Sequence, residues 1–171
     1  MWSQPLRRLA PRRFKVALIV ATIAAFLVVS VSDASECAAT AALVVTDMSG
    51  RALAEFPLDE TLEFRVWFVH SSERHLWVNV FSATGTNMVL KEIRVPSTGP
   101  GVPSTAEPGW HIAVADGWIV YSGVNRVYDE LAFLLSSISP HMIEVGGESC
   151  DLPSILGDGV LVTLRVVVHE E

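Results

Sequence analysis

The segment LEFRVWFV, residues 62–69, has an apolar side chain at every second position. These positions are Leu62, Phe64, Val66 and Phe68. A β-strand turns successive side chains to opposite faces, so this alternation is typical of a strand with one buried face. The segment VLVTLRVVVH, residues 160–169, repeats the pattern near the end of the chain. Both segments therefore predict β-structure.

Six further apolar runs predict strands separated by turn residues: Ala42–Thr46, Leu76–Ser82, Met88–Val95, Trp110–Ala115, Trp118–Tyr121 and Met142–Val145. Asp116-Gly117 and Gly146-Gly147 are residue pairs that tight hairpin turns favour. A helix is indicated only near Pro153–Leu156 and at Tyr128–Ser137, which suits a buried strand equally well. We expect an all-β fold, an antiparallel β-sandwich or partly open barrel of about eight strands.

A basic and apolar leader precedes these strands. The 17 uncharged residues Val16–Ser32 follow the cations Arg7, Arg8, Arg12, Arg13 and Lys15. This order is typical of an export signal whose basic end stays in the cytoplasm. As a helix the run would span about 25 Å, between the lengths of a signal peptide and a membrane anchor.

We expect one N-terminal hydrophobic helix within residues 1–34, acting as a signal peptide cleaved after Ala34 or as a retained membrane anchor. Residues 35–171 would form a single all-β exported domain, in the periplasm or anchored to the inner membrane and facing the periplasm.

The leader contains five of the 12 basic residues and one of the 19 acidic residues. The rest has seven basic and 18 acidic residues, a net charge of −11. Such a surface disfavours nucleic acid and anionic lipid, and suits a cationic ligand or a basic partner.

Both cysteines, Cys37 and Cys150, belong to the expected exported part. In an oxidising compartment they are candidates for one disulfide, which would stabilise the fold by about 4–5 kcal/mol in the chain-entropy model. No Cys-x-x-Cys or Cys/His spacing in the sequence indicates a structural zinc site.

The segment Pro96–Ser104, PSTGPGVPS, has three prolines and two glycines in nine residues, so it predicts a loop. Glycine-rich loops can bind anions through backbone amides, but Pro100 and Pro103 have no amide hydrogen to donate. We therefore expect a structural loop over one end of the sheet. The tryptophans Trp67, Trp77, Trp110 and Trp118 predict core packing or, where exposed, a platform for a ligand.

The polar candidates for chemistry follow the segment 62–69. His70 and Ser71 are adjacent on a strand, so they would point to opposite faces, and the sequence has no Gly-x-Ser-x-Gly motif. His70, Glu73 and His75, with His111 or His141, are residue types that bind zinc or copper, but their spacing matches no metal motif. Arg126, after Asn125, suits a salt-bridged turn or a site for a carboxylate ligand. We expect no catalytic residues, metal or cofactor.

Four motifs resemble, in order, a family of small exported proteins called domain of unknown function 1850. They are FVHSSERHLWVNVF (68–81), STGPGVPS (97–104), DGWIVYSGVNRVYDEL (116–131) and HMIEVGG (141–147). The resemblance covers about Leu43 to Val168. It implies signature positions at His70, Ser71, Gly99, Gly101, Pro103, Gly123, Asn125, Arg126 and His141.

The resemblance also implies a function, because genes of this family commonly lie beside those for TAXI-type TRAP transporters, which take up organic acids. No enzyme activity is assigned to the family. This chain departs from the family where Leu76–Asn79 replaces a proline followed by glutamates, and where Pro100 replaces a small residue.

Two functions of different classes follow. The first is an exported, non-catalytic accessory protein that contacts the TRAP permease or its soluble binding protein. The second is a periplasmic module that binds a small molecule or metal through His70, Arg126 and His141. An enzyme would require His70 and His141 to meet a nucleophile or metal in one cleft.

Overall fold

Eleven strands and one short helix form the regular structure of the described residues, 40–70, 74–103 and 105–169, in this computed structural model. The strands are β1 (Thr40–Asp47), β2 (Ala52–Pro57), β3 (Glu63–Val69), β4 (Leu76–Thr84), β5 (Asn87–Val95), β6 (His111–Ala115), β7 (Trp118–Tyr128), β8 (Leu131–Leu134), β9 (His141–Val145), β10 (Glu148–Asp151) and β11 (Leu161–His169). The helix is α1 (Leu152–Leu156).

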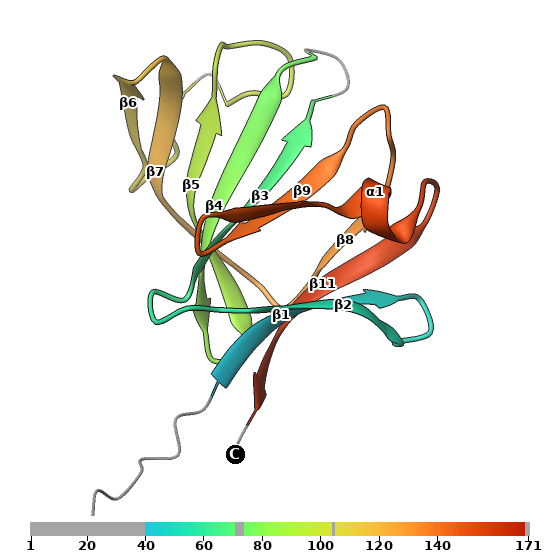
Figure 1. Cartoon of the computed structure of the whole chain (residues 1–171). Helices are drawn as coiled ribbons and strands as arrows, with labels where there is room; N and C mark the ends of the chain where they lie inside the picture. The colour runs from blue at the N-terminus through green and yellow to red at the C-terminus, as the bar shows by residue number, and fades with distance from the viewer. Residues whose placement is uncertain (1–39, 71–73, 104, 170–171) are drawn as a thin grey trace, which may run out of the picture. The chain divides into compact units, whose positions relative to one another are not determined.

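The strands form two antiparallel sheets (Figure 1). The smaller sheet has the order β2-β1-β11-β8, and the larger has the order β10-β9-β3-β4-β5-β7-β6. Neither sheet closes into a barrel, since each has two edge strands. The predicted antiparallel β-sandwich is therefore confirmed, although the described residues contain eleven strands rather than about eight.

The core lies between the two sheets and follows the predicted alternation. Phe64 of β3 is 2% exposed and stacks on Phe81 of β4, with ring centroids 5.2 Å apart. Val45 of β1 and Leu164 of β11 supply fully buried side chains from the smaller sheet. Leu62 differs from the prediction, because it precedes β3 in a turn with φ 54° and is exposed.

Two strands were missed by the sequence pattern, namely β2 and β10. β2 and β10 contain proline or acidic residues and lie at sheet edges, where one side of the strand meets solvent. β8 falls within Tyr128–Ser137, for which the sequence predicted either a helix or a buried strand. Its pairing with β11 shows that this segment contains a strand. Trp118–Tyr121 was predicted too short, since β7 continues to Tyr128.

The predicted turns and the short helix are confirmed. Asp116-Gly117 connects β6 to β7, and Gly146-Gly147 connects β9 to β10, each with positive φ at both residues. This geometry matches the right-handed twist of the paired strands. The helix α1 begins after Asp151, whose carboxylate accepts a hydrogen bond from the backbone amide of Ser154.

The predicted leader, residues 1–34, and Cys37 lie outside the described residues, so the signal or anchor and the Cys37–Cys150 disulfide stay predictions. Cys150 itself is partly buried on β10. Across residues 40–70, 74–103 and 105–169, no helix has the length and apolar character needed to span a membrane.

Candidate functional site

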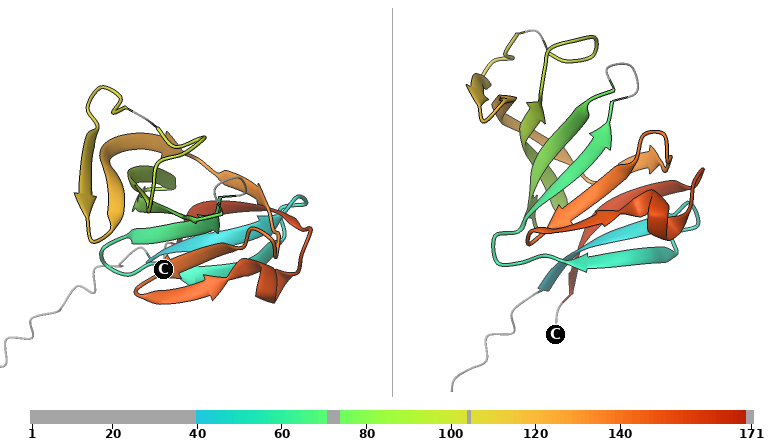
Figure 2. Two further views of the ribbon diagram at one scale, coloured as in Figure 1. Left: turned by 90° about the horizontal axis from the view of Figure 1, so that it is seen from above. Right: turned by 45° about the horizontal axis from the view of Figure 1, so that its top comes forward.

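A loop connects β5 to β6, and its residues 96–103 lie at the top of Figure 1, at one end of the larger sheet. Residues 105–110 run back beside β7 to the start of β6 (Figure 2). Val102 and Trp110 of this segment are buried. The hydroxyl of Tyr121 on β7 donates a hydrogen bond of 2.7 Å to the carbonyl of Pro103. Trp110 packs edge-on against the same tyrosine, with ring centroids 6.3 Å apart. The loop is therefore anchored on β7, as the sequence predicted for a structural loop.

The glycines of this loop allow it to approach His70. The amide of Val102 donates to the carbonyl of Gly99, which closes a turn around Gly101. Gly101 has φ 85°, and a Cβ at this position would lie 3.1 Å from Nε2 of His70. Glycine adopts this backbone conformation without strain, whereas another residue would be strained and would also press on the ring of His70. His70, Gly99 and Gly101 thus belong to one contact between the end of β3 and the loop.

A second group of signature residues forms a β-bulge in β7. Between the pairs Leu90↔Arg126 and Glu92↔Ser122, the three residues 123–125 of β7 face one residue of β5. Gly123 has φ 75°, and a Cβ there would lie 2.6 Å from the carbonyl oxygen of Gly109. The bulge therefore brings β7 against the C-terminal part of the loop.

Asn125 and Arg126 complete this bulge. Asn125 has φ 50°, and its side-chain amide donates to the carbonyl of Gly123 at 3.2 Å. The guanidinium of Arg126 donates to Glu107 at 2.6 Å and lies 5.1 Å from the ring centroid of Trp110. The bond to Glu107 raises the pKa of Arg126 above its ordinary value. The sequence predicted for Arg126 either a salt-bridged turn or a site for a carboxylate ligand. The contact with Glu107 corresponds to the salt-bridged turn.

Six aromatic rings form a continuous stack along the inner face of the larger sheet and onto β8. Consecutive centroids lie between 4.5 and 6.2 Å apart. The order is His75, His70, Trp77, Phe68, His141 and Phe133. Strand pairing produces the centre of the stack, because Phe68 of β3 lies opposite Trp77 of β4 and His141 of β9. The sequence pattern did not predict this stack, since the strand register was unknown.

Two histidines of the stack, His75 and His141, have buried ring nitrogens. Among the described residues, neither ring nitrogen of His75 nor Nδ1 of His141 has a hydrogen-bond partner, and all three atoms are buried. Burial lowers the pKa of His141 below its ordinary value, and the backbone of Ser139 acts in the opposite direction. Within the described residues, no three His, Cys, Asp or Glu side chains are grouped closely enough to hold a metal ion.

We expect His141 to make the stability of the protein depend on pH. Its pKa is lower in the folded state than in the unfolded state, so the unfolded state binds the proton first. The contribution to stability is complete above the unfolded pKa, about 6.5, and is lost as the pH falls toward the folded pKa. Replacing His141→Phe keeps a ring between Phe68 and Phe133 but removes the titrating group.

The measurement is urea unfolding at several pH values from about 7 down to about 5, for wild type and His141→Phe. The free energy of unfolding should fall less steeply with decreasing pH in the variant. Identical pH dependence in both proteins would show that His141 does not contribute.

The predicted site residues thus fall into two clusters connected by the loop. His70 and His141 belong to the ring stack, whereas Gly123, Asn125 and Arg126 form the bulge that holds the loop near Glu107. Ser71 lies outside the described residues.

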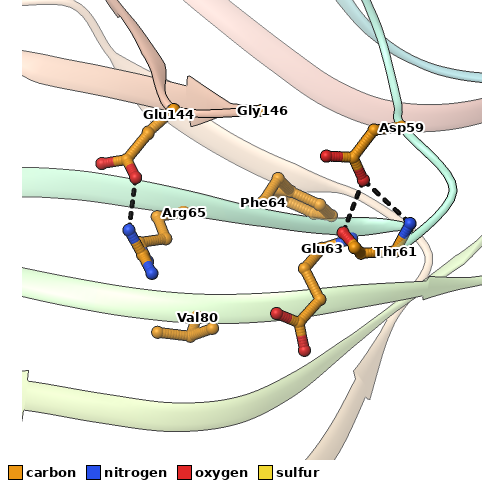
Figure 3. Close-up of a pocket in the computed structure, with 9 residues that line it drawn as sticks. Asp59, Thr61, Glu63, Phe64, Arg65, Val80, Glu144 and Gly146 are labelled. Atoms are coloured by element: carbon orange, nitrogen blue, oxygen red, sulfur yellow. Dashed lines mark hydrogen bonds and ion pairs between the residues drawn. The ribbon is translucent and has the colours of Figure 1, made fainter.

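A hollow of about 280 Å³ lies at the other end of β3, beside the turn at Asp59–Thr61 (Figure 3). Arg65 forms an ion pair with Glu144 across the strands, and Asp59 accepts a 2.9 Å hydrogen bond from the amide of Thr61. The carboxylates of Asp59 and Glu144 therefore have structural partners, and Glu63 is a third carboxylate in the lining. Sequence reasoning gave no signal for this hollow, because its residues come from three separate segments.

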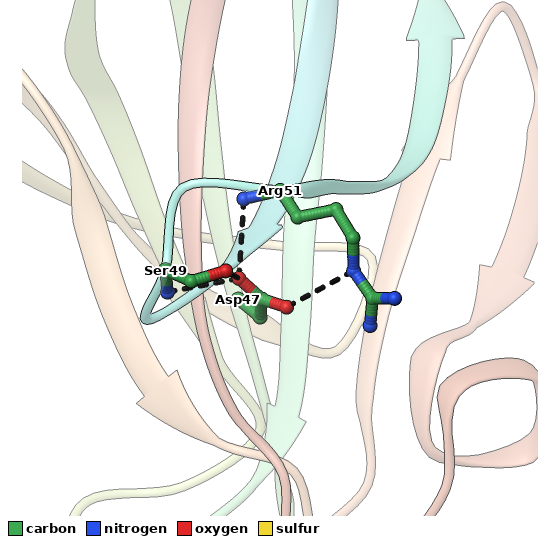
Figure 4. A network of polar contacts seen from close by, with 3 residues as sticks. All are labelled: Asp47, Ser49 and Arg51. Carbon is green, nitrogen blue, oxygen red and sulfur yellow. Dashed lines mark hydrogen bonds and ion pairs between the residues drawn. The ribbon is translucent and has the colours of Figure 1, made fainter.

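A further polar network closes the hairpin between β1 and β2 (Figure 4). The carboxylate of Asp47 accepts hydrogen bonds from the amides of Ser49 and Arg51 and from Nε of Arg51, at 2.9, 3.1 and 3.2 Å. The side-chain bond from Ser49 is the largest cause of a lowered pKa for Asp47. This cluster stabilises a turn, as aspartates often do in proteins.

The fold and the anchored loop define an open antiparallel β-sandwich in which the signature residues connect a loop to the larger sheet. The chain belongs to the family described as domain of unknown function DUF1850, whose model matches residues 64–152. This range begins in β3 and ends at α1, and it includes all nine signature positions. Comparison with curated proteins and with solved structures gave no match.

Proposed function

We propose that this protein is an exported accessory protein of a TAXI-type TRAP uptake system for organic acids. It acts by contact with the permease or with the soluble binding protein, and not by catalysis. The basic and apolar leader supports export, and the resemblance described above supports the transporter. The use of the signature residues to anchor a loop supports a structural role for them.

The observation that carries the proposal is the exposed edge strand β6. All five residues of β6 are exposed, including Ile112 and Val114 at 44% and 78%. Its outer edge presents unpaired backbone groups, and the strand has no proline, lysine or acidic residue. Proteins usually protect such edges against strand pairing. Adding a partner strand is a common mode of recognition, and β6 is suited to it.

The other edge strands are less suited to this contact. β2 contains Glu55 and Pro57, and β10 contains two acidic residues. β8 is apolar but only four residues long. The proposed contact is therefore assigned to β6.

The test is co-purification of transporter components with the tagged full chain from native membranes. The double variant Ile112→Lys, Val114→Lys places two charges on β6 and should abolish co-purification. The matched control is Ile138→Lys, since Ile138 is 87% exposed and lies outside the strands, and it should behave as wild type. The proposal fails if neither the permease nor the binding protein accompanies wild type.

A second candidate is a binding module for a small anion or metal, with His70 and His141 of the ring stack and Arg126 of the bulge as its candidate residues. The buried ring nitrogens of His75 and His141 favour it, because buried polar atoms without partners are uncommon in native proteins. Zinc, copper and small carboxylates should then raise the thermal midpoint of wild type. The shift should vanish in Arg126→Ala, measured against that variant's own ligand-free midpoint. No shift with any of these ligands would exclude this module.

A further inference from the structure

The outer face of the larger sheet, which points away from the smaller sheet, presents two tryptophans and two arginines. Strand register places one row of side chains across this face: Met142, Trp67, Val78, Arg94, Val120 and Ala113. Trp118 lies two residues before Val120, so it points to the same side. Val78 is only 5% exposed although the described residues place no second sheet over this face, because the long neighbouring side chains surround it.

Three hollows follow one another along this face. A hollow of about 150 Å³ lies between Trp67 and Trp118, and Arg65 and Arg94 also line it. Arg94 and Trp118 also line a neighbouring hollow of about 460 Å³ that extends to Asp116. Arg65 also lines the hollow of about 280 Å³ beside Asp59. Arg65 lines two of the hollows, and Arg94 and Trp118 also line two, so the three hollows are neighbours on this face and are together called the outer groove.

The charges along the centre of this groove are already compensated. Arg65 pairs with Glu144, and Arg94 pairs with Glu92 at 2.6 Å. A phosphate or an organic anion would have to compete with both glutamates for the guanidinium groups. Each of these arginine–glutamate pairs instead offers hydrogen-bond donors and acceptors together. The two pairs have no net charge. This chemistry suits a neutral ligand that has many hydroxyl groups.

The indoles supply the second half of this recognition. Tryptophan presents a large flat apolar surface, on which the C–H face of a sugar ring can stack. The Nε1 of Trp67 is buried without an acceptor in the described structure. Because this nitrogen is shielded from solvent, recognition by the indole rests on stacking of its ring and not on this donor. An elongated groove with aromatic surfaces and planar polar groups is therefore complementary to a chain of sugar units.

We propose that the outer face of the larger sheet binds a neutral oligosaccharide, which lies across the strands and stacks on Trp67 and Trp118. The indoles and guanidinium groups of the outer groove come from β3, β5 and β7, and β6 contributes only Ala113 and Ala115 to the lining. The groove gives the protein a ligand site that does not depend on the transporter contact.

The experiment is titration of the full chain, purified in detergent, with neutral tetrasaccharides of glucose, xylose and N-acetylglucosamine. Tetragalacturonate is the anionic comparison, and tryptophan fluorescence is the readout. At least one neutral tetrasaccharide should bind, and Trp118→Ala should weaken it by about tenfold or more. The control Leu161→Ala removes a partly exposed apolar side chain on the smaller sheet and should leave the affinity unchanged.

Trp118→Phe keeps a smaller ring and should lie between wild type and Trp118→Ala, so it tests stacking even if the alanine variant folds poorly. Three results would overturn the proposal. They are no binding of any neutral tetrasaccharide to wild type, equal affinity in wild type and both Trp118 variants, or stronger binding of tetragalacturonate than of every neutral chain.

Discussion

Replacing Gly123→Ala is expected to lower the free energy of unfolding by about 2–3 kcal/mol. Gly123 has φ 75°, a conformation that side chains other than glycine rarely adopt. The added Cβ would also lie 2.6 Å from the carbonyl oxygen of Gly109, which is closer than such atoms approach in proteins. Either the bulge or the loop must move, and the contact of Arg126 with Glu107 would then be disturbed.

Urea unfolding followed by tryptophan fluorescence measures this loss. Gly147→Ala is the matched control, because Gly147 has φ 86° but its Cβ would meet no atom within 4 Å. The Gly147→Ala variant should lose only the free energy of unfolding that this backbone conformation costs an alanine, about 1 kcal/mol. Equal losses in both variants would contradict the role of Gly123 in seating the loop.

Replacing Phe81→Ala is expected to have the larger effect, a loss of about 3–5 kcal/mol. Phe81 is 1% exposed, stacks on Phe64 and meets the edge of Tyr128 at 6.1 Å. Removing the ring leaves a cavity in the core beside Phe64 and Tyr128. Since small domains are stable by about 5–15 kcal/mol, a large part of the total would be lost.

The same urea experiment measures this variant, and Ile138→Ala is its control. Ile138 is 87% exposed, so its truncation should change the free energy of unfolding by less than about 0.5 kcal/mol. A loss below about 1 kcal/mol for Phe81→Ala would contradict the packing of Phe81 in the core.

The sequence predicted those parts of the fold in which one face of a strand is buried. Residues 63–69 and 161–169 alternate because one side packs on the core and the other does not. The strands β2 and β10 could not be predicted in this way. They are edge strands whose positions depend on pairing with β1 and β9, and a local pattern does not encode a distant partner.

The candidate site was predictable residue by residue but not as an arrangement. Gly101 and Gly123 were found as signature positions, yet their purpose depends on His70 and on the carbonyl of Gly109. Those contacts form only when the loop folds back onto β3 and β7. The ring stack has the same origin, because His141 is 73 residues from Phe68 in the chain but opposite it in the sheet.

The outer groove could be anticipated only in part. The sequence indicated that exposed tryptophans could form a ligand platform, and Trp67 and Trp118 line the same hollow. It gave no sign that Arg65 and Arg94 would lie between them, each paired with a glutamate. Charge pairing across strands depends on register, which the sequence pattern does not fix.

The most direct test of the proposed function is the uptake of a panel of organic acids by cells that retain the neighbouring transporter genes but lack this gene. We predict that uptake is lost on deletion and is restored by wild type and by Ile138→Lys, but not by the double variant Ile112→Lys, Val114→Lys. Uptake of every acid at the wild-type rate after deletion would contradict the assignment to transport.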